Sequence, residues 1–239
     1  MIDLRFYEIW REQIFVEKLI NGIGTSVSLM ILGGIIGFIF GLALATARGS
    51  KIRLLRIPSA TFIESVRNTP LIVQLFFVCF GLPMIFEYRW PFFASALLAL
   101  CLNFSAYYAE IIRAGFENVE YGQSEAARAL GLGKNDILAY IVLPQALAKV
   151  YPSLVSQFVF LFLTTGIISE VGVEDLTWAG RYIADRNFRD FEVFIVLTIA
   201  YGLLSVIFRG VLTATGQLVF PWNRAVSYTH LTLPTICSV

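Results

Sequence analysis

The residues with the most distinctive chemistry in this 239-residue chain lie in one polar segment, residues 125–144. Residues 131–135, with the sequence GLGKN, superficially resemble a phosphate-binding loop. The full motif, G-x-x-x-x-G-K-[ST], also requires a glycine at position 128 and a serine or threonine at position 135. Arg128 and Asn135 stand there instead. We therefore interpret the glycines as turn residues, and expect the chain to bind neither ATP nor Mg²⁺ and not to be an enzyme.

The same segment is typical of two short helices joined by a sharp bend. Helix-forming residues run from 117 to 130, and Gly131 can adopt the left-handed conformation that closes a helix. Asn135 and Asp136 then favour a turn and a fresh helix start. Pro144 is expected to break the second helix and to begin the next apolar stretch.

The side chains of the first helix favour contact with another protein. Ala126, Ala127 and Ala129 make this helix thin enough to enter a groove. Glu125 and Arg128 can supply polar contacts at its edge. The sequence therefore predicts a docking surface rather than a catalytic site.

Composition identifies the surroundings of this segment as a membrane. Hydrophobic residues make up 57% of the chain and charged residues 15%, against about 25% charged in a soluble domain. A net charge of +1 gives no reason to expect nucleic-acid binding. Cys79, Cys101 and Cys237 show no metal-ligand or disulfide spacing, and the lone His230 offers no metal site.

The apolar pattern predicts an all-α membrane protein with about five transmembrane helices. Each expected span has roughly 20 or more mostly apolar residues. The spans are 20–47, 59–84, 91–114, 144–168 and 191–218. Gly33, Gly37 and Gly41 share one face of the first span and predict a close packing seam.

We divide the chain into three parts. Residues 1–19 form an amphipathic segment, in which residues 3–19 are expected to lie as a helix on the membrane surface. Residues 20–224 form the transmembrane domain, whose loop 115–143 contains the docking surface. Residues 225–239 are rich in threonine and aliphatic residues but carry no charge. We attribute this tail to an artefact or a frame shift at the end of the gene, and exclude it from functional reasoning.

Lys and Arg mark the segments expected in the cytoplasm. They cluster after the first span, around the docking loop and at the end of the last span, at Arg48, Lys51, Arg53, Arg56, Arg113, Arg128, Lys134, Lys149, Arg209 and Arg224. Acidic residues gather in and beside the 169–190 loop, on the opposite side. This distribution predicts an N-terminus outside the cell and a cytoplasmic C-terminus.

Four motifs resemble one family of membrane proteins. The spacing E-A-A, Gly131 and I-x-L-P is similar to the EAA signature of ATP-binding-cassette importer permeases, on which the ATPase subunit pushes. Residues 67–77 (RNTPLIVQLFF) and 106–115 (AYYAEIIRAG) resemble segments of the polar-amino-acid branch, for histidine, glutamine, arginine or glutamate and aspartate. Residues 121–127 (YGQSEAA) and 143–146 (LPQA) match the same branch.

The resemblance covers most of residues 20–220 and implies both a fold and a set of partners. The fold is the importer-permease core of the methionine-importer type, with cytoplasmic coupling helices. The implied partners are two ATPase subunits that bind ATP and Mg²⁺, a second permease subunit that is either a copy or a paralogue, an external solute receptor and membrane lipids. The implied location is a bacterial inner membrane. The implied coupling residues are Glu125, Ala126, Ala127, Arg128, Gly131 and Pro144.

Polar residues in the spans are candidates for the substrate path, because polar groups are costly in a membrane. Gln74, Asn103 and Gln157 are expected first to bond between helices and second to line the path. In the fourth span, Leu163 and Thr164 replace a Lys-Asp pair that is usual in this branch. Thr164 and Glu170 are therefore predicted to face the path, with Glu170 favouring a substrate ammonium group. The alternative is that Glu170 caps the outer end of the span.

Two pairs of oppositely charged residues lie near the inner ends of the predicted spans. Glu64 and Arg67 stand three residues apart, as do Glu110 and Arg113. Each pair is expected to neutralise its charges at the inner membrane edge or to take part in gating.

The sequence also argues against two other classes of protein. A secondary transporter working without an ATPase would need a built-in ion site and often an inverted repeat, which the sequence lacks. An intramembrane enzyme would need catalytic motifs that are also absent.

Overall fold

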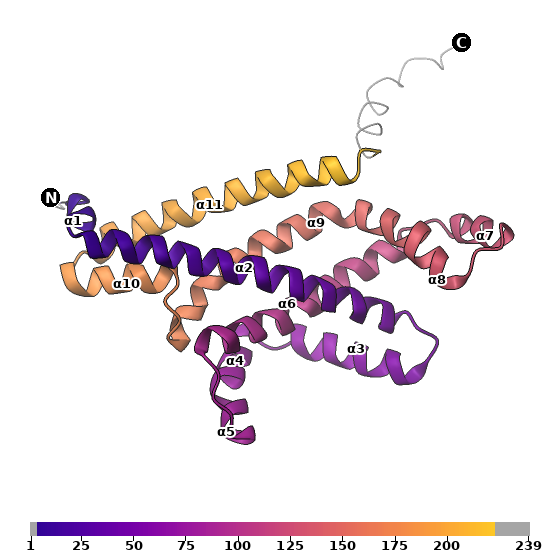
Figure 1. Ribbon diagram of the computed structural model, residues 1–239, viewed down its shortest axis with the longest axis horizontal. Helices are drawn as coiled ribbons and strands as arrows, with labels where there is room; N and C mark the ends of the chain where they lie inside the picture. Colours follow the sequence, from indigo (N-terminus) through magenta and orange to yellow (C-terminus); the bar gives the residue numbers. More distant parts are fainter. Residues whose placement is uncertain (1–3, 223–239) are drawn as a thin grey trace, which may run out of the picture.

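The computed structural model describes residues 4–222, and within this range all regular structure is helical (Figure 1). In chain order, the helices are α1 (Tyr7–Trp10), α2 (Gln13–Arg48), α3 (Arg53–Arg67), α4 (Leu71–Phe76), η1 (Phe77–Gly81), α5 (Leu82–Phe86), α6 (Phe92–Glu117), α7 (Tyr121–Ala129), α8 (Lys134–Asp136), η2 (Ile137–Val142), α9 (Leu143–Thr164), η3 (Thr165–Val171), α10 (Leu176–Asn187) and α11 (Asp190–Val219). The segments η1 and η2 are π-helical, and η3 is a 3₁₀-helix. The predicted class, an all-α membrane protein, is confirmed. The anomalous tail 225–239 lies outside the described residues.

Four helices of the described chain are long and apolar enough to cross a membrane, and one bent pair supplies a fifth candidate. The four are α2, α6, the continuous helix Lys134–Val171 and α11. The bent pair joins α3 to Leu71–Phe86 at an angle of 109°. The span predicted near 59–84 is therefore divided by a sharp bend. Pro70 explains the break, because a proline disfavours helical geometry at the residue before it and supplies no amide hydrogen.

The predicted break at Pro144 is also wrong, since the helix continues from Lys134 to Val171. Pro144 cannot donate a backbone hydrogen bond, and its ring would clash with the carbonyl four residues earlier in a regular helix. The chain widens into the π-helix Ile137–Val142 immediately before Leu143 and Pro144. The same arrangement recurs where η1 precedes Leu82 and Pro83. In both places a wider turn accommodates a proline without breaking the helix.

The N-terminal segment differs from the single surface helix expected over 3–19. It consists of the short α1 and the first turns of α2, which begins at Gln13. Ile9, Phe15 and Leu19 are buried in a cluster with Leu176 and Ile183 of α10. The helix α10 itself lies in the predicted loop 169–190, and its N-cap is Asp175, which accepts a hydrogen bond from the Trp178 amide at 2.8 Å.

The glycines of α2 form the predicted packing seam, and their neighbour is α6. A β-carbon on Gly33 would meet the Leu100 side chain at 3.6 Å, and one on Gly37 would meet the Cys101 carbonyl oxygen at 3.5 Å. Gly41 is packed more tightly, because its β-carbon would lie 2.7 Å from Cβ of Tyr108. The small residues thus let two spans approach closely, as dispersion-driven packing in lipid requires.

Helix α6 is the centre of the molecule, since it packs against α2, α3, α4 and α9. Its residues Leu100, Phe104 and Tyr108 are fully buried. Figure 1 shows α7 and α8 at one end of the long axis, the end at which α2 finishes and α3 begins. Helices α1 and α10 lie at the opposite end. The docking segment and the N-terminal cluster are therefore on opposite sides of the spans.

Candidate functional site

The docking helix α7 is joined to α6 by three residues only, because α6 ends at Glu117 and α7 begins at Tyr121. Its end is closed by Gly131, which has φ 83°. The Gly131 amide donates to the Arg128 carbonyl at 2.9 Å, and the Leu132 amide donates to the Ala127 carbonyl at 3.2 Å. This pair of bonds is the Schellman motif, and it confirms the predicted left-handed helix end.

The exposed side of α7 carries most of the residues predicted to dock. Glu125, Ala126, Arg128 and Ala129 are exposed, so their side chains are available to a partner. Ala127 is only 5% exposed and lies on the opposite side of the helix, where α7 packs against η2. Ala127, which was predicted to dock, therefore faces the inside of the protein. Pro144 is half-buried in the first turn of α9.

Three large apolar side chains on this loop were not identified from the sequence. Leu130 is 81% exposed, Tyr140 is 73% exposed and Tyr121 is 67% exposed. Tyr121 begins α7, Leu130 directly follows its end, and Tyr140 lies in η2, which packs against α7. Together they add exposed apolar surface beside α7, a feature that suits contact with a partner when it is contiguous. The sequence contains these three side chains, but it does not indicate that the fold leaves them exposed.

The ends of the loop are tied together. Lys149 of α9 donates a hydrogen bond to the Asn118 carbonyl, directly after the end of α6. The Asn118 side chain donates to the Ala114 carbonyl at 2.8 Å. A cation is favourable at the C-terminus of a helix, where the carbonyls carry partial negative charge. These bonds hold the end of α6 against α9, next to the start of α7.

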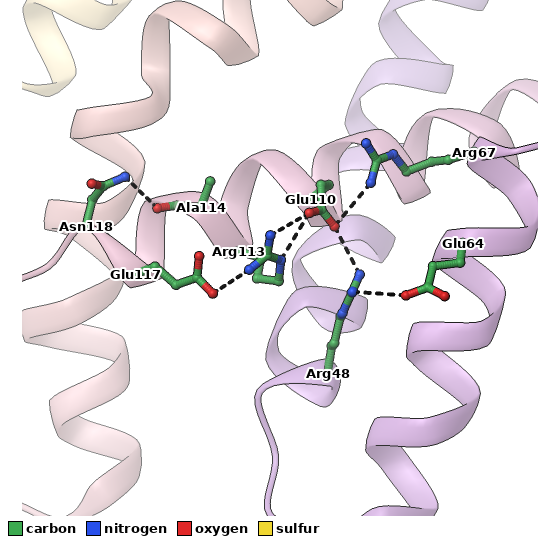
Figure 2. A network of polar contacts seen from close by, with 8 residues as sticks. All are labelled: Arg48, Glu64, Arg67, Glu110, Arg113, Ala114, Glu117 and Asn118. Carbon is green, nitrogen blue, oxygen red and sulfur yellow. Dashed lines mark hydrogen bonds and ion pairs between the residues drawn. The ribbon is translucent and has the colours of Figure 1, made fainter.

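Glu110 of α6 is the centre of an ion-pair network that joins three helices (Figure 2). Its carboxylate lies 2.6 Å from Arg113, 3.0 Å from Arg48 of α2 and 3.3 Å from Arg67 of α3. The predicted pair of Glu110 with Arg113 is confirmed. Arg113 also pairs with Glu117, the last residue of α6.

The predicted pair of Glu64 with Arg67 is wrong. Glu64 pairs with Arg48 of α2 at 3.3 Å, and Arg67 points to Glu110 (Figure 2). The i,i+3 rule identifies neighbours on one helix surface, but α6 and the end of α2 pack against α3 and offer closer partners. The charges therefore hold separate helices together rather than stabilising α3 alone.

Gln74 and Asn103 fasten the bent second span. The Gln74 amide donates to the Val66 carbonyl at 2.8 Å and to the Thr69 hydroxyl at 2.6 Å, across the break between α3 and α4. The Asn103 amide of α6 donates to the Gln74 side-chain oxygen at 2.9 Å. This agrees with the expectation that these residues bond between helices. The bend at Pro70 is thus fixed by side chains as well as by the proline.

A cavity of about 700 Å³ opens beside this bend. It is lined by Arg67, Asn68, Thr69, Pro70, Leu71, Asn103, Phe104, Tyr107, Phe160, Leu163, Thr164 and Ile167. The volume falls in the usual range for small-molecule sites. Arg67 carries the sole formal charge among these lining residues, and Thr164, Asn103 and Asn68 supply neutral polar groups. Two of the five predicted path residues, Asn103 and Thr164, therefore lie on its wall.

The other predicted path residues lie elsewhere. Gln74 stands behind Asn103 at the bend. Gln157 is half-buried in α9, and its amide nitrogen has no hydrogen-bond partner within residues 4–222. Glu170 pairs with Arg181 of α10 and does not line the cavity. Arg181 thus already offsets the negative charge that was expected to favour a substrate ammonium group. The role of these residues in transport stays a prediction.

Known proteins are similar to this chain over most of its length. The model of the family described as "Binding-protein-dependent transport system inner membrane component" matches residues 37–220. A probable amino-acid ABC transporter permease protein of Sinorhizobium fredii is 34% identical over 72% of this chain and 74% of its own length. The glutamine transport system permease protein of Escherichia coli K12 is 32% identical over 82% of this chain and 90% of its own. An octopine transport system permease protein of Rhizobium radiobacter is 30% identical over 89% of each chain.

Solved structures show the same arrangement of helices. The crystal structure of an amino acid ABC transporter with histidines has a chain that superposes with a TM-score of 0.81 at 32% identity, over 90% of this chain and 99% of the other. The inward-facing MetNI methionine ABC transporter has a TM-score of 0.74 at 17% identity, over 87% of this chain and 99% of that one. The second likeness concerns the fold alone.

Proposed function

The chain belongs to the family of binding-protein-dependent transport system inner membrane components, and we propose that it serves an ATP-binding-cassette importer of a polar amino acid as its permease subunit. The names of the compared relatives include glutamine and octopine, and one compared structure was solved with histidines. These names support an amino-acid substrate. They argue against the alternative of a secondary transporter that works without an ATPase.

The observation that carries the coupling mechanism is the position of α7. This helix is exposed, stands at one end of the spans and connects two long membrane helices without a flexible linker (Figure 1). Partner ATPase subunits, which bind ATP and Mg²⁺, dock on Glu125, Ala126, Arg128 and the apolar residues around them. Closure of these subunits on ATP moves the docked helices and thereby the spans. Energy enters only as a difference in docking free energy between the inward-facing and outward-facing states.

The charge distribution supports an orientation across a bacterial inner membrane. Arg48, Lys51 and Arg53 lie in or beside the turn that joins α2 to α3, at the same end as Lys134 and α7 (Figure 1). Excess Lys and Arg in short loops marks the cytoplasmic side. The N-terminus is then outside and α11 ends in the cytoplasm, where ATP is. A solute receptor delivers substrate to the opposite end, which α1 and α10 form.

A second permease subunit completes the path, as a copy of this chain or a paralogue. Helices α2 and α11 leave much of their apolar surface uncovered, for example at Ile39, Leu203 and Val206. Lipid and a second subunit are the two environments that suit such surfaces in a membrane.

Reconstitution tests this function. The chain is co-expressed with the candidate ATPase and receptor of the same importer, and the complex is placed in proteoliposomes. We expect uptake of an amino acid that requires both internal ATP and loaded receptor. Uptake that runs on an ion gradient without ATP would instead identify a secondary transporter. Titration of the receptor with single amino acids then identifies the substrate.

A further inference from the structure

Arg67 belongs both to the cavity wall and to the ion-pair network. Its guanidinium nitrogen Nη1 lies 3.3 Å from Oε2 of Glu110, and its Cζ lies 5.8 Å from the centre of the Tyr107 ring. Among residues 4–222, its side chain has these two contacts and no hydrogen bond within normal geometry. A guanidinium carries five N–H donors. Arg67 therefore lines the cavity with donor groups that the protein itself does not use.

Arg67 is the most weakly held of the three cations around Glu110. Arg113 donates two hydrogen bonds to Oε1 of Glu110, at 2.6 and 3.2 Å. Arg48 donates one to Oε2 at 3.0 Å, so Arg67 shares this oxygen with it and lies farther away (Figure 2). If Arg67 turned away, Glu110 would still keep two hydrogen-bonded cations. The cost of losing Arg67 from the network is correspondingly small.

An anion in the cavity would compete with Glu110 for the guanidinium of Arg67. None of the other residues that line it carries a formal charge, so an entering anion finds Arg67 as its sole cationic partner there. Guanidinium and carboxylate groups match in geometry and form two parallel hydrogen bonds. Every α-amino acid carries an α-carboxylate, whatever its side chain. The chemistry of the wall therefore fits the part of the substrate that all candidate amino acids share.

We propose that Arg67 binds the α-carboxylate of the transported amino acid, and that it releases Glu110 to do so. The inference rests on the proposed function. Substrate and Glu110 then compete for one guanidinium. Arg113 links Glu110 to Glu117, the last residue of α6, and three residues separate Glu117 from the docking helix α7. The exchange therefore changes the charge balance at the end of the helix that leads into α7.

The experiment measures binding without the receptor, which would select amino acids by itself. The complete permease and ATPase complex is placed in lipid nanodiscs, and binding of radiolabelled L-glutamine, L-arginine and L-glutamate is measured. Each is competed against its own α-amide, which lacks the carboxylate. We expect the amide to bind about tenfold more weakly or worse, which is the scale of hydrogen bonds between charged groups.

Two matched variants separate the site from the network. Arg67→Gln should weaken binding of the amino acid by about tenfold or more and remove its preference over the amide. Arg48→Gln removes the other cation from the same Glu110 oxygen, but Arg48 does not line the cavity. The Arg48→Gln variant should keep the preference for the amino acid over its α-amide. Glu110→Gln removes the competitor and should bind the amino acid several-fold more tightly.

Several results would overturn the proposal. These are an Arg67→Gln variant that still prefers the amino acid, equal loss of preference in Arg67→Gln and Arg48→Gln, or unchanged affinity in an assembled Glu110→Gln complex. Should Glu110→Gln fail to assemble, the other two variants still decide. Absence of saturable binding of all three amino acids to the wild type would also overturn it. ATP-driven, receptor-dependent uptake by the same preparation would show that the proposed function stands regardless.

Discussion

At the scale of single residues, two positions combine an unusual conformation or environment with a place at a helix end. Gly131 closes the docking helix α7 with positive φ, and Asp175 begins α10 as a fully buried carboxylate. Gly131 could be recognised from the sequence, because a glycine after a run of helix formers is a local signal. Asp175 could not, since its burial depends on α2 and α11 packing over it.

Gly131 should be replaceable by asparagine but not by valine. Nothing lies within 4 Å of a β-carbon built there, so the restriction comes from φ alone. A left-handed conformation costs an ordinary residue about 1–2 kcal/mol, whereas asparagine adopts it readily. We expect Gly131→Val to lower the amount of amino acid imported per ATP hydrolysed, and Gly131→Asn to remain close to wild type. Equal coupling in both variants would show that the shape of this turn is unimportant.

Asp175 should make the stability of the protein depend on pH. Burial raises its pKa from 3.8 to about 6, although hydrogen bonds from Trp178 and Tyr201 oppose this. The folded state therefore binds the proton more tightly than the unfolded state. The contribution of Asp175 to stability is greatest below about pH 4 and is lost as the pH rises to about 6.

Thermal unfolding in detergent between pH 4 and 7 measures this effect. Asp175→Asn should flatten the dependence on pH across that window. The matched control is Asp185→Asn, which changes an exposed carboxylate on the same helix. The account of Asp175 fails if wild type and Asp175→Asn have parallel profiles.

At the scale of elements, hydropathy located the long helices but not their breaks and continuations. It reads residues 59–84 as one span because both arms of the bent pair are apolar, yet Pro70 divides them. It also leaves α10 in a loop, because the amphipathic pattern of α10 has too few apolar residues for a span. The cavity could not be predicted, since α3, α4, α6 and α9 meet there only through long-range packing.

The seam between α2 and α6 gives a test at this scale. A β-carbon on Gly41 would lie 2.7 Å from Tyr108 Cβ and 2.8 Å from the Ser105 carbonyl oxygen, so the helices would have to separate. Overpacking of this kind costs about 1–3 kcal/mol. We expect Gly41→Ala to lower the melting temperature in detergent. Gly24→Ala, where nothing lies within 4 Å of the new carbon, is the control on the same helix. A similar melting temperature for both variants would contradict the seam.

At the scale of the whole molecule, the cavity lies beside the central helix α6 and the predicted docking surface lies just beyond its end. The cavity lies along the middle of α6, at Asn103 and Tyr107, and the docking surface follows its end. The Glu110 network lies between them and holds α6 to α2 and α3 (Figure 2). A sequence motif predicted the docking segment, whereas the cavity emerges only from the packing of the helices. Their connection through Arg67 required the structure, because that residue bonds to another helix and not to its own neighbour Glu64.

The central claim, that a partner ATPase grips the exposed side of α7, is tested most directly by site-specific cross-linking. Ala126 and Ala127 are adjacent, yet the first is exposed and the second is buried. Each is replaced by cysteine in turn, and a short cross-linker with a maleimide at one end and a photoreactive diazirine at the other is added to the assembled complex, which is then irradiated. We predict that Ala126→Cys cross-links to the ATPase subunit, with a yield that changes when ATP is bound, and that Ala127→Cys does not. An Ala126→Cys complex that imports the amino acid normally but gives no cross-link would contradict the account.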